Sequence, residues 1–239
     1  MPQTYVIKLG GSIVSPNLDI FFDFDYLKRL RECLEDNIQQ GDKFFFVLGG
    51  GSTMRHYRDL AITAGLTDHN QLHWIGTTVN VLHAEIVRAY FHELADDGVY
   101  KYEDYYDENP LIIKKSFKIG GGGRPGHSGD VDAVCAAKKC KAAAIISLKN
   151  IDAVYSADPK KDNNAVKVDE LSWQEYLNVI GNPDEHTPGA NYPIDPIAAK
   201  DAQTHHLKFI ICDGWNLENF KNILNNKPFD GSTIYDKKI

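Results

Sequence analysis

Two kinds of hydrophobic pattern alternate along this chain. Short, wholly apolar runs such as 44–48 are typical of strands that are buried on both faces. Between these runs, apolar residues recur every three or four positions, as Leu27, Leu30 and Leu34 do, which predicts a helix over 25–40. The alternation predicts an α/β fold, with a mainly parallel sheet sandwiched by helices. Further strands are expected at 5–9, 111–119, 142–148, 208–212 and 232–235, and further helices at 53–64, 71–94, 131–139, 173–179, 194–203 and 217–225.

Three segments have weaker patterns. The aromatic and acidic stretch 100–106 is expected to form a short strand and a turn, and the polar stretch 152–164 a loop. The last apolar run, 232–235, is expected to be an edge strand. No long linker, low-complexity tract or repeat interrupts residues 1–239, so we expect a single domain with two lobes.

Composition narrows the class of protein. Hydrophobic residues make up 43% and charged residues 25%, as in ordinary soluble domains. The net charge of −7 argues against nucleic-acid or membrane-surface binding, which needs extended basic faces. No apolar run approaches the roughly 20 residues that span a membrane, and the first residues carry no leader pattern, so we expect a cytoplasmic location. The four cysteines lack framework spacing, which favours reduced thiols.

Glycine-rich turns carry the candidate chemistry. Gly10 and Gly11 follow the strand that ends with Lys8, and the triplet 49–51 follows the strand 44–48. A strand, a glycine turn and a helix in this order aim backbone amides at a ligand beyond the carboxyl end of a parallel sheet. Ser52 is expected to be the N-cap of the second helix, with Arg55 in its first turn.

The segment 120–130 is a third turn of this design. It holds four consecutive glycines, then Arg124, and it ends with Asp130 at the start of an apolar helix. Unshielded backbone amides, a fixed positive charge and a helix N-terminus together favour phosphate. Three such turns in one chain predict a protein that handles nucleotide phosphates.

The common nucleotide motifs fit poorly. A P-loop needs a Gly-Lys pair, which does not occur in the chain. The glycines at 121, 123 and 126 match the dinucleotide fingerprint only formally, because Pro125 lies inside it and no acidic residue follows at the expected distance. The His-Arg-Asp and Asp-Phe-Gly motifs of protein kinases are absent. The histidines and cysteines show no metal-ligand spacing, so no metal site of the protein itself is expected.

The ordered set of motifs resembles the amino acid kinase family, whose carbamate kinase-like fold is therefore expected. The marks are the segments 8–12, 49–51, 125–130 and 150–161. Within that family the chain is most similar to the uridylate (UMP) kinases of the archaeal type, and the likeness continues through 194–200 to 231–234. It implies an acceptor lobe over about 1–140 and an ATP lobe over about 141–239. It also implies ATP as donor, UMP as acceptor, Mg²⁺ arriving with ATP, and self-association as a dimer or hexamer.

The same resemblance assigns roles to individual residues. Lys8 would bridge the β- and γ-phosphates and Asp130 would orient Lys8, the two being the catalytic residues. Arg55 would clamp the acceptor phosphate. The residues implied for ATP are Lys8, Gly10, Gly11, Asn150, Asp152, Tyr155, Asp158 and Lys160, and those implied for UMP are Gly49, Gly50, Gly51, Arg55, Gly123, Arg124, Pro125, His127 and Ser128.

Several positions depart from that pattern on the acceptor side. Ser128 and Gly129 replace a Thr-Thr pair, and Val81 and His83 stand where archaeal members carry Arg and Asn. Two alternatives therefore stay open beside a UMP kinase. One is a sister kinase of the same fold with another phosphate or carboxylate acceptor. The other is a non-catalytic protein that binds ATP and oxoanions, similar to the molybdenum-storage proteins.

Overall fold

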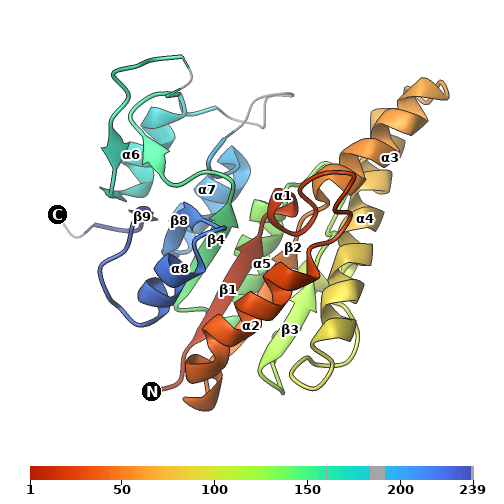
Figure 1. The fold of residues 1–239 in the computed structure, drawn as a ribbon. Coiled ribbons are helices and arrows are strands. Elements are labelled where there is room, and N and C mark those ends of the chain that lie inside the picture. The colour runs from red at the N-terminus through yellow and green to blue at the C-terminus, as the bar shows by residue number, and fades with distance from the viewer. Residues whose placement is uncertain (160, 184–191, 238–239) are drawn as a thin grey trace.

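A twisted central sheet organises the molecule (Figure 1). The computed structural model describes residues 1–159, 161–183 and 192–237, and within them seven strands form one sheet in the order β3-β2-β1-β4-β8-β9-β7. From β3 to β8 all pairs are parallel, whereas β9 runs antiparallel to β8. The strands are β1 (Thr4–Leu9), β2 (Lys43–Leu48), β3 (Phe117–Gly120), β4 (Ala144–Lys149), β7 (Glu170–Leu171), β8 (Phe209–Asp213) and β9 (Ser232–Ile234), with β5 (Val154–Tyr155) and β6 (Lys167–Val168) as a separate antiparallel pair.

Helices cover both faces of this sheet, which confirms the predicted fold class. Alternate residues of β1 and β2 enter two different cores, because successive side chains of a strand point to opposite faces. Ile7 and Phe46 pack with α2 and α8, while Val6 and Phe45 pack with α5, α6 and α7. The helices are α1 (Gly11–Val14), α2 (Phe24–Gln39), α3 (Gly51–Thr63), α4 (His69–Tyr90), α5 (Gly129–Cys140), α6 (Trp173–Val179), α7 (Pro196–Thr204) and α8 (Leu217–Leu224), with a short 3₁₀ helix η1 (Tyr102–Tyr105).

Parallel pairing places the candidate chemistry at one edge of the sheet. β1, β2, β3 and β4 end side by side, and α1, α3 and α5 begin beyond these ends. Three helix N-termini therefore converge on the edge where Lys8, the glycine triplet 49–51 and Asp130 lie. A helix N-terminus attracts anions through its free amides and its dipole.

Two of the expected elements are wrong in the region before the glycine loop. The strand expected over 111–119 is limited to Phe117–Gly120, because the amides of Lys114 and Lys115 donate to the Asp96 carboxylate at 3.0 and 2.7 Å. The strand and turn expected at 100–106 is largely the helix η1. There the side chain of Asp104 accepts from the amide of Lys101 at 2.9 Å, which favours a tight turn.

Two expectations near the end of the chain also need correction. β9 was expected at an edge, but it lies between β8 and β7, so the two-residue strand β7 forms the edge instead. The segment 152–164 is not wholly loop, since β5 lies inside it and pairs with β6. Both corrections involve strands of two residues, which are too short for a periodic pattern to indicate.

Candidate active site

The first two glycine turns pack directly against each other. A Cβ atom on Gly11 would lie only 2.1 Å from the amide nitrogen of Gly51, and one on Gly49 would lie 2.7 Å from the nitrogen of Gly11. Gly51 also has a φ of +55°, in the left-handed region that favours glycine. The close backbone contact therefore needs glycine at these positions, and it leaves the amides at the starts of α1 and α3 beside one another.

Hydroxyl groups tie the same two turns together. The Oγ of Ser15 lies 2.9 Å from the Oγ of Ser52 and 2.9 Å from the Oγ1 of Thr53, all three residues being buried. Ser52 was expected to be an N-cap, and this is wrong: α3 begins at Gly51, with Gly50 as the N-cap, so Arg55 lies in the second turn. Ser52 instead joins α3 to the end of α1.

A buried carboxylate between two lysines lies at the centre of the edge. Asp130, 4% exposed, has Oδ1 at 2.9 Å from the Nζ of Lys8 and Oδ2 at 3.2 Å from the Nζ of Lys149. Its Oδ2 also accepts from the amide of Asp195 at 3.2 Å, and Lys149 donates to the carbonyl of Pro193. The structure thus places Asp130 beside Lys8, as an orienting role requires, and it adds Lys149, which was not among the predicted site residues.

The charges in this group shift one another's pKa values. Burial by itself would raise the pKa of Asp130, but the ammonium groups of Lys149 and Lys8 outweigh it and lower the pKa to about 2. Burial and the nearby charge of Lys8 lower the pKa of Lys149 to about 8, against the opposing effect of Asp130. Two cations with one anion leave an excess positive charge in a buried place, which an incoming phosphate would neutralise.

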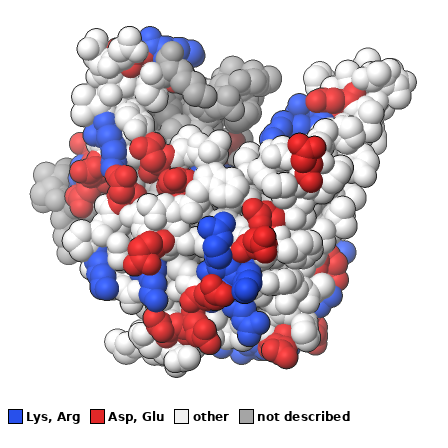
Figure 2. Space-filling view, viewed as in Figure 1, with Lys and Arg blue, Asp and Glu red and all other residues white. Residues whose placement is uncertain are grey.

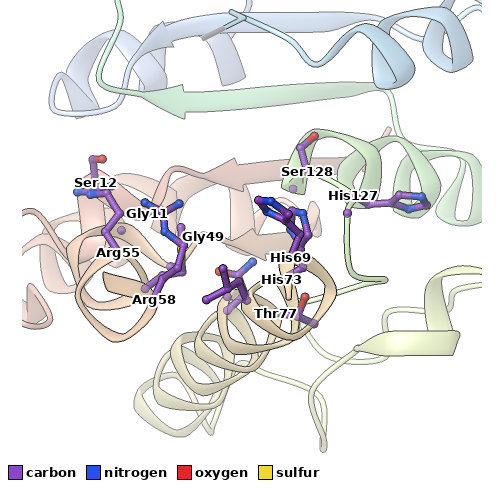
Figure 3. Close-up of a pocket in the computed structure, with 18 of the residues that line it drawn as sticks. Gly11, Ser12, Gly49, Arg55, Arg58, His69, His73, Thr77, His127 and Ser128 are labelled. Atoms are coloured by element: carbon purple, nitrogen blue, oxygen red, sulfur yellow. The ribbon is translucent and has the colours of Figure 1, made fainter. Parts of the chain in front are cut away.

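A cavity of about 610 Å³ opens next to Lys8, between α3, α4 and the start of α5 (Figure 3). This volume suits a ligand of nucleotide size. Most of the groups that line it are amides of the glycine turns, basic side chains and small polar side chains. The lining residues are Lys8, Gly11, Ser12, Gly49, Gly50, Gly51, Met54, Arg55, Arg58, Ile62, His69, Leu72, His73, Gly76, Thr77, Asn80, Gly126, His127, Ser128 and Gly129.

The side chains of this cavity are basic and lack acidic neighbours. Arg55 and Arg58 come from α3 and His69 and His73 from α4, and no Asp or Glu is among the lining residues. Within the part of the chain that the structure describes, Arg55 has no hydrogen-bond or ion-pair partner. A guanidinium without a counter-ion among the described residues, in a cavity that is also lined by glycine turns and Lys8, is arranged to bind an anion. Arg58, His69 and His73 were not among the predicted site residues. A signal was present, because Arg55 and Arg58 are three positions apart and His69 and His73 are four apart, spacings that place each pair on one face of a helix.

The predicted acceptor residues do not all reach this cavity. The three glycines 49–51, Arg55, His127 and Ser128 line it. Gly123, Arg124 and Pro125 line a neighbouring hollow of about 350 Å³ instead. The Arg124 guanidinium forms an ion pair with Glu103 at 2.6 Å and lies 4.2 Å from the centre of the Tyr106 ring, so its charge is already partnered.

Of the predicted donor residues, Lys8, Gly10 and Gly11 lie at the end of β1 or directly after it, and the others follow β4, the neighbour of β1 on the side away from β2. Of these, Gly11 lines the cavity and Gly10 donates its amide to the carbonyl of Leu148 at 2.9 Å. The hydroxyl of Tyr155 donates to Oδ2 of Asp152 at 2.8 Å, so these two form one unit. Asn150 and Asp158 are exposed, and Lys160 lies outside the described residues.

The position of His83, one of the departures from the archaeal pattern, gives this residue a structural role. It is buried, and its Nδ1 lies 2.9 Å from the carbonyl oxygen of Gly49. Burial lowers the pKa of His83, which favours the neutral ring with a proton on Nδ1 that is donated to Gly49. His83 therefore supports the second glycine turn from behind, outside the cavity.

Charged side chains on one face of the molecule, and metal-ligating side chains in the described part of the chain, can be compared with this cavity. On the face shown in Figure 2, lysine and arginine side chains are interspersed with acidic ones. Among residues 1–159, 161–183 and 192–237, no three His, Cys, Asp or Glu side chains come together in a way that could hold a metal ion. The same ranges contain four cysteines without a disulfide, of which Cys33, Cys135 and Cys212 are buried.

Comparison with known proteins agrees with this geometry. The model of the amino acid kinase family matches residues 3–213. A protein named uridylate kinase from Methanocorpusculum labreanum is 30% identical over 234 residues, which cover 98% of this chain and 96% of that protein. Another uridylate kinase, from Archaeoglobus fulgidus, is 30% identical over 209 residues, covering 87% of this chain and 90% of its own length.

Solved structures show the same relation in three dimensions. The crystal structure of uridylate kinase from Archaeoglobus fulgidus has a TM-score of 0.79 and 28% identity, and the match covers 96% of this chain and 99% of that one. The UMP kinase structure from Bacillus anthracis has a TM-score of 0.77 at 19% identity, covering 100% and 98%. At that identity the second similarity concerns the fold alone.

Proposed function

This chain belongs to the amino acid kinase family, and we propose that within it the protein is a UMP kinase, which transfers the γ-phosphate of ATP to UMP and releases UDP and ADP. The observation that carries this proposal is Arg55. Its guanidinium lines the same cavity as Lys8 and the glycine amides, without a partner among the described residues. A monophosphate acceptor supplies the bidentate anion that such a group binds, whereas an uncharged acceptor would leave it buried by the ligand and unpaired.

The chemistry requires positioning and charge neutralisation rather than a base. A phosphate oxygen of UMP is already ionised near pH 7, so no proton has to be removed before it attacks the γ-phosphorus. The bond from that oxygen to phosphorus forms as the bond to the β–γ bridging oxygen breaks, and ADP leaves with that oxygen. The amides of Gly11 and Gly50 and the ammonium of Lys8 would stabilise the charge of the transferring group.

Asp130 and Lys149 would act on Lys8 and on the donor. Asp130 holds the ammonium of Lys8 by an ion pair and leaves its remaining N–H groups for phosphate oxygens. Lys149, on the other oxygen of Asp130, brings a second positive charge to the end of β4, where the donor segment begins. Both oxygens of Asp130 are thus engaged by lysines, which makes this carboxylate a poor metal ligand. We propose that Mg²⁺ is held by the phosphates of ATP and by water, and supplies further charge neutralisation when bound.

The experiment that tests the proposal is an ADP-release assay across possible acceptors. The panel contains UMP, CMP, dUMP, aspartate, acetylglutamate and isopentenyl phosphate, with ATP and Mg²⁺ constant. We expect the highest kcat/KM with UMP. A faster reaction with a carboxylate or isoprenoid acceptor would replace the proposal with a sister kinase. ATP binding without ADP release for any acceptor would favour a non-catalytic nucleotide- or oxoanion-binding protein.

We further propose that the protein works in the cytoplasm in pyrimidine nucleotide synthesis and associates with copies of itself as a dimer or hexamer. Among the helices of the described residues, none combines the length and the apolar character that crossing a membrane would need. Size-exclusion chromatography with light scattering would measure the assembly, and a monomer at all concentrations would contradict that part of the proposal.

A further inference from the structure

A second buried carboxylate lies behind the acceptor loop, and within the described residues it has no hydrogen bond or ion pair to Lys8, Asp130 or Lys149. Asp132, on α5, is 3% exposed and has no ion-pair partner within the described ranges. Its Oδ2 accepts from the amide of Gly123 at 3.1 Å, and its Oδ1 lies 3.4 Å from the hydroxyl of Tyr106. A Cβ atom on Gly123 would lie 2.1 Å from Oδ1, so this carboxylate takes the space that any larger residue at 123 would need. Burying a carboxylate without an ion-pair partner lowers the stability of the folded state, so Asp132 is a candidate for a functional role.

The Tyr106 hydroxyl connects this carboxylate to the acceptor loop. It lies 2.8 Å from Nδ1 of His127 and accepts from the amide of Arg124 at 3.4 Å. In Figure 3 the ring of His127 points away from His69 and His73. The residue itself still lines the cavity, two positions before Gly129. Asp132, Tyr106 and His127 therefore form one hydrogen-bond chain from the core to the wall of the cavity.

Counting protons gives this chain two complete arrangements. The Tyr106 hydroxyl has a single proton to donate. If Asp132 is ionised, it accepts that proton in a hydrogen bond, and Nδ1 of His127 must carry a proton of its own to donate to the Tyr106 oxygen. If Asp132 is protonated, it donates to the Tyr106 oxygen, Tyr106 donates to Nδ1, and the neutral ring carries its proton on Nε2. Every partner is satisfied in each arrangement, and they differ in the tautomer of His127.

We propose that Asp132 and Tyr106 are positioning residues that hold the acceptor loop 123–127 and pass the protonation state of the buried carboxyl on to His127. The groups that face Asp132 are Lys8 on β1, Tyr105 on η1, Tyr106 after η1, and Asp130 and Cys135 on its own helix. Burial has the largest effect on this carboxyl and raises the pKa of Asp132 to about 7. The hydrogen bonds from the Gly123 amide and the Tyr106 hydroxyl lower the pKa, but by less. The change of state therefore falls near neutral pH.

The spectroscopic test follows the ring nitrogens of His127 directly. In protein labelled with ¹⁵N, we expect the neutral ring to change from the Nε2–H to the Nδ1–H tautomer as the pH rises through about 7. Asp132→Asn imitates the protonated acid, so its ring should stay in the Nε2–H form up to pH 8.5. Tyr106→Phe breaks the chain and should leave a tautomer that does not respond to pH in this range. Tyr235→Phe, which removes an exposed hydroxyl bonded to Glu170 at 3.1 Å, is the matched control and should behave as the wild type. An identical His127 titration in wild type and Asp132→Asn would overturn the relay.

The positioning role is tested by kinetics and rests on the proposed UMP kinase function. At pH 8, Tyr106→Phe should raise the KM for UMP by about two- to tenfold, the value of one net hydrogen bond, with the KM for ATP unchanged. An equal rise for both nucleotides, or none, would overturn positioning of the acceptor loop. The NMR titration needs no substrate. If the acceptor is not UMP, the kinetic test no longer applies, but the NMR titration still tests the link between Asp132 and His127.

Discussion

The Nζ atom of Lys8 lies 2.9 Å from Oδ1 of Asp130, although the two residues come from different elements, the end of β1 and the first turn of α5. Both side chains are largely shielded from water, so the pair is screened far less than a surface ion pair. The contact fixes the ammonium group at the place where the three glycine turns meet.

Replacing Asp130 by Asn tests the role of this contact in catalysis. The variant keeps the shape of the side chain but removes the charge that holds Lys8. We expect turnover to fall by roughly tenfold to a thousandfold while UMP and an ATP analogue bind with near-normal affinity, because the contact acts mainly in the transition state. Calorimetry beside the turnover number measures both. Asp201→Asn, which breaks the ion pair with Lys138 away from the cavity, is the control and should keep full activity. Full activity in Asp130→Asn would reduce Asp130 to a helix-capping residue.

Lys149 predicts a pH dependence of the free enzyme. Its pKa is lowered to about 8, so the ammonium loses its proton as the pH rises through that value. If its charge is needed, kcat/KM for ATP in the wild type should fall above about pH 8. Lys149→Arg stays charged in this range and should shift the fall to higher pH, whereas Lys149→Met should be slow at every pH. An alkaline limb that is the same in wild type and Lys149→Arg would assign it to another group.

Arg55→Ala tests the acceptor clamp. Loss of a charge-assisted, bidentate contact should weaken UMP binding by about 1.5–3 kcal/mol, or roughly ten- to a hundredfold, with little change for ATP. Titration calorimetry with each nucleotide measures this. Arg31→Ala, an exposed arginine of α2, is the matched control. Equal losses for both nucleotides would indicate a structural or donor-side role for Arg55.

His83 predicts a loss of stability in acid. Its folded-state pKa lies below the ordinary 6.5, so below that pH the unfolded chain binds a proton that the folded chain resists. The stabilisation is thus present above about pH 6.5 and is lost as the pH falls. Urea unfolding at pH 7.5 and 5.5 should show a smaller loss for His83→Asn than for the wild type. A loss of the same size in both would mean that other groups cause the acid sensitivity.

Much of the fold and of the cavity was predictable from the sequence by itself. Apolar runs and helical periodicity identified β1, β2, β4 and α2 within one or two residues, because both patterns reflect burial that local geometry imposes on neighbouring positions. The glycine turns were predictable for a similar reason, since a tight turn before a helix restricts the residues that form it. Because parallel strands end at one edge of a sheet, the predicted parallel sheet already placed Lys8, the triplet 49–51 and Asp130 at the same edge.

Only the tertiary structure decided which partners the polar side chains have. Lys149 directly follows the strand expected at 142–148 and was not among the predicted site residues, yet β4 lies next to β1, and this brings its ammonium to Asp130. Arg124 looked like a phosphate ligand, yet Glu103 and Tyr106 hold its guanidinium in a neighbouring hollow. Nothing in the sequence distinguishes Asp132 from other helix residues, whereas in the structure it accepts a hydrogen bond from the amide of Gly123. Contacts of this kind join residues far apart in the chain, and the energy of a buried charge depends on what surrounds it in space, which a local pattern does not contain.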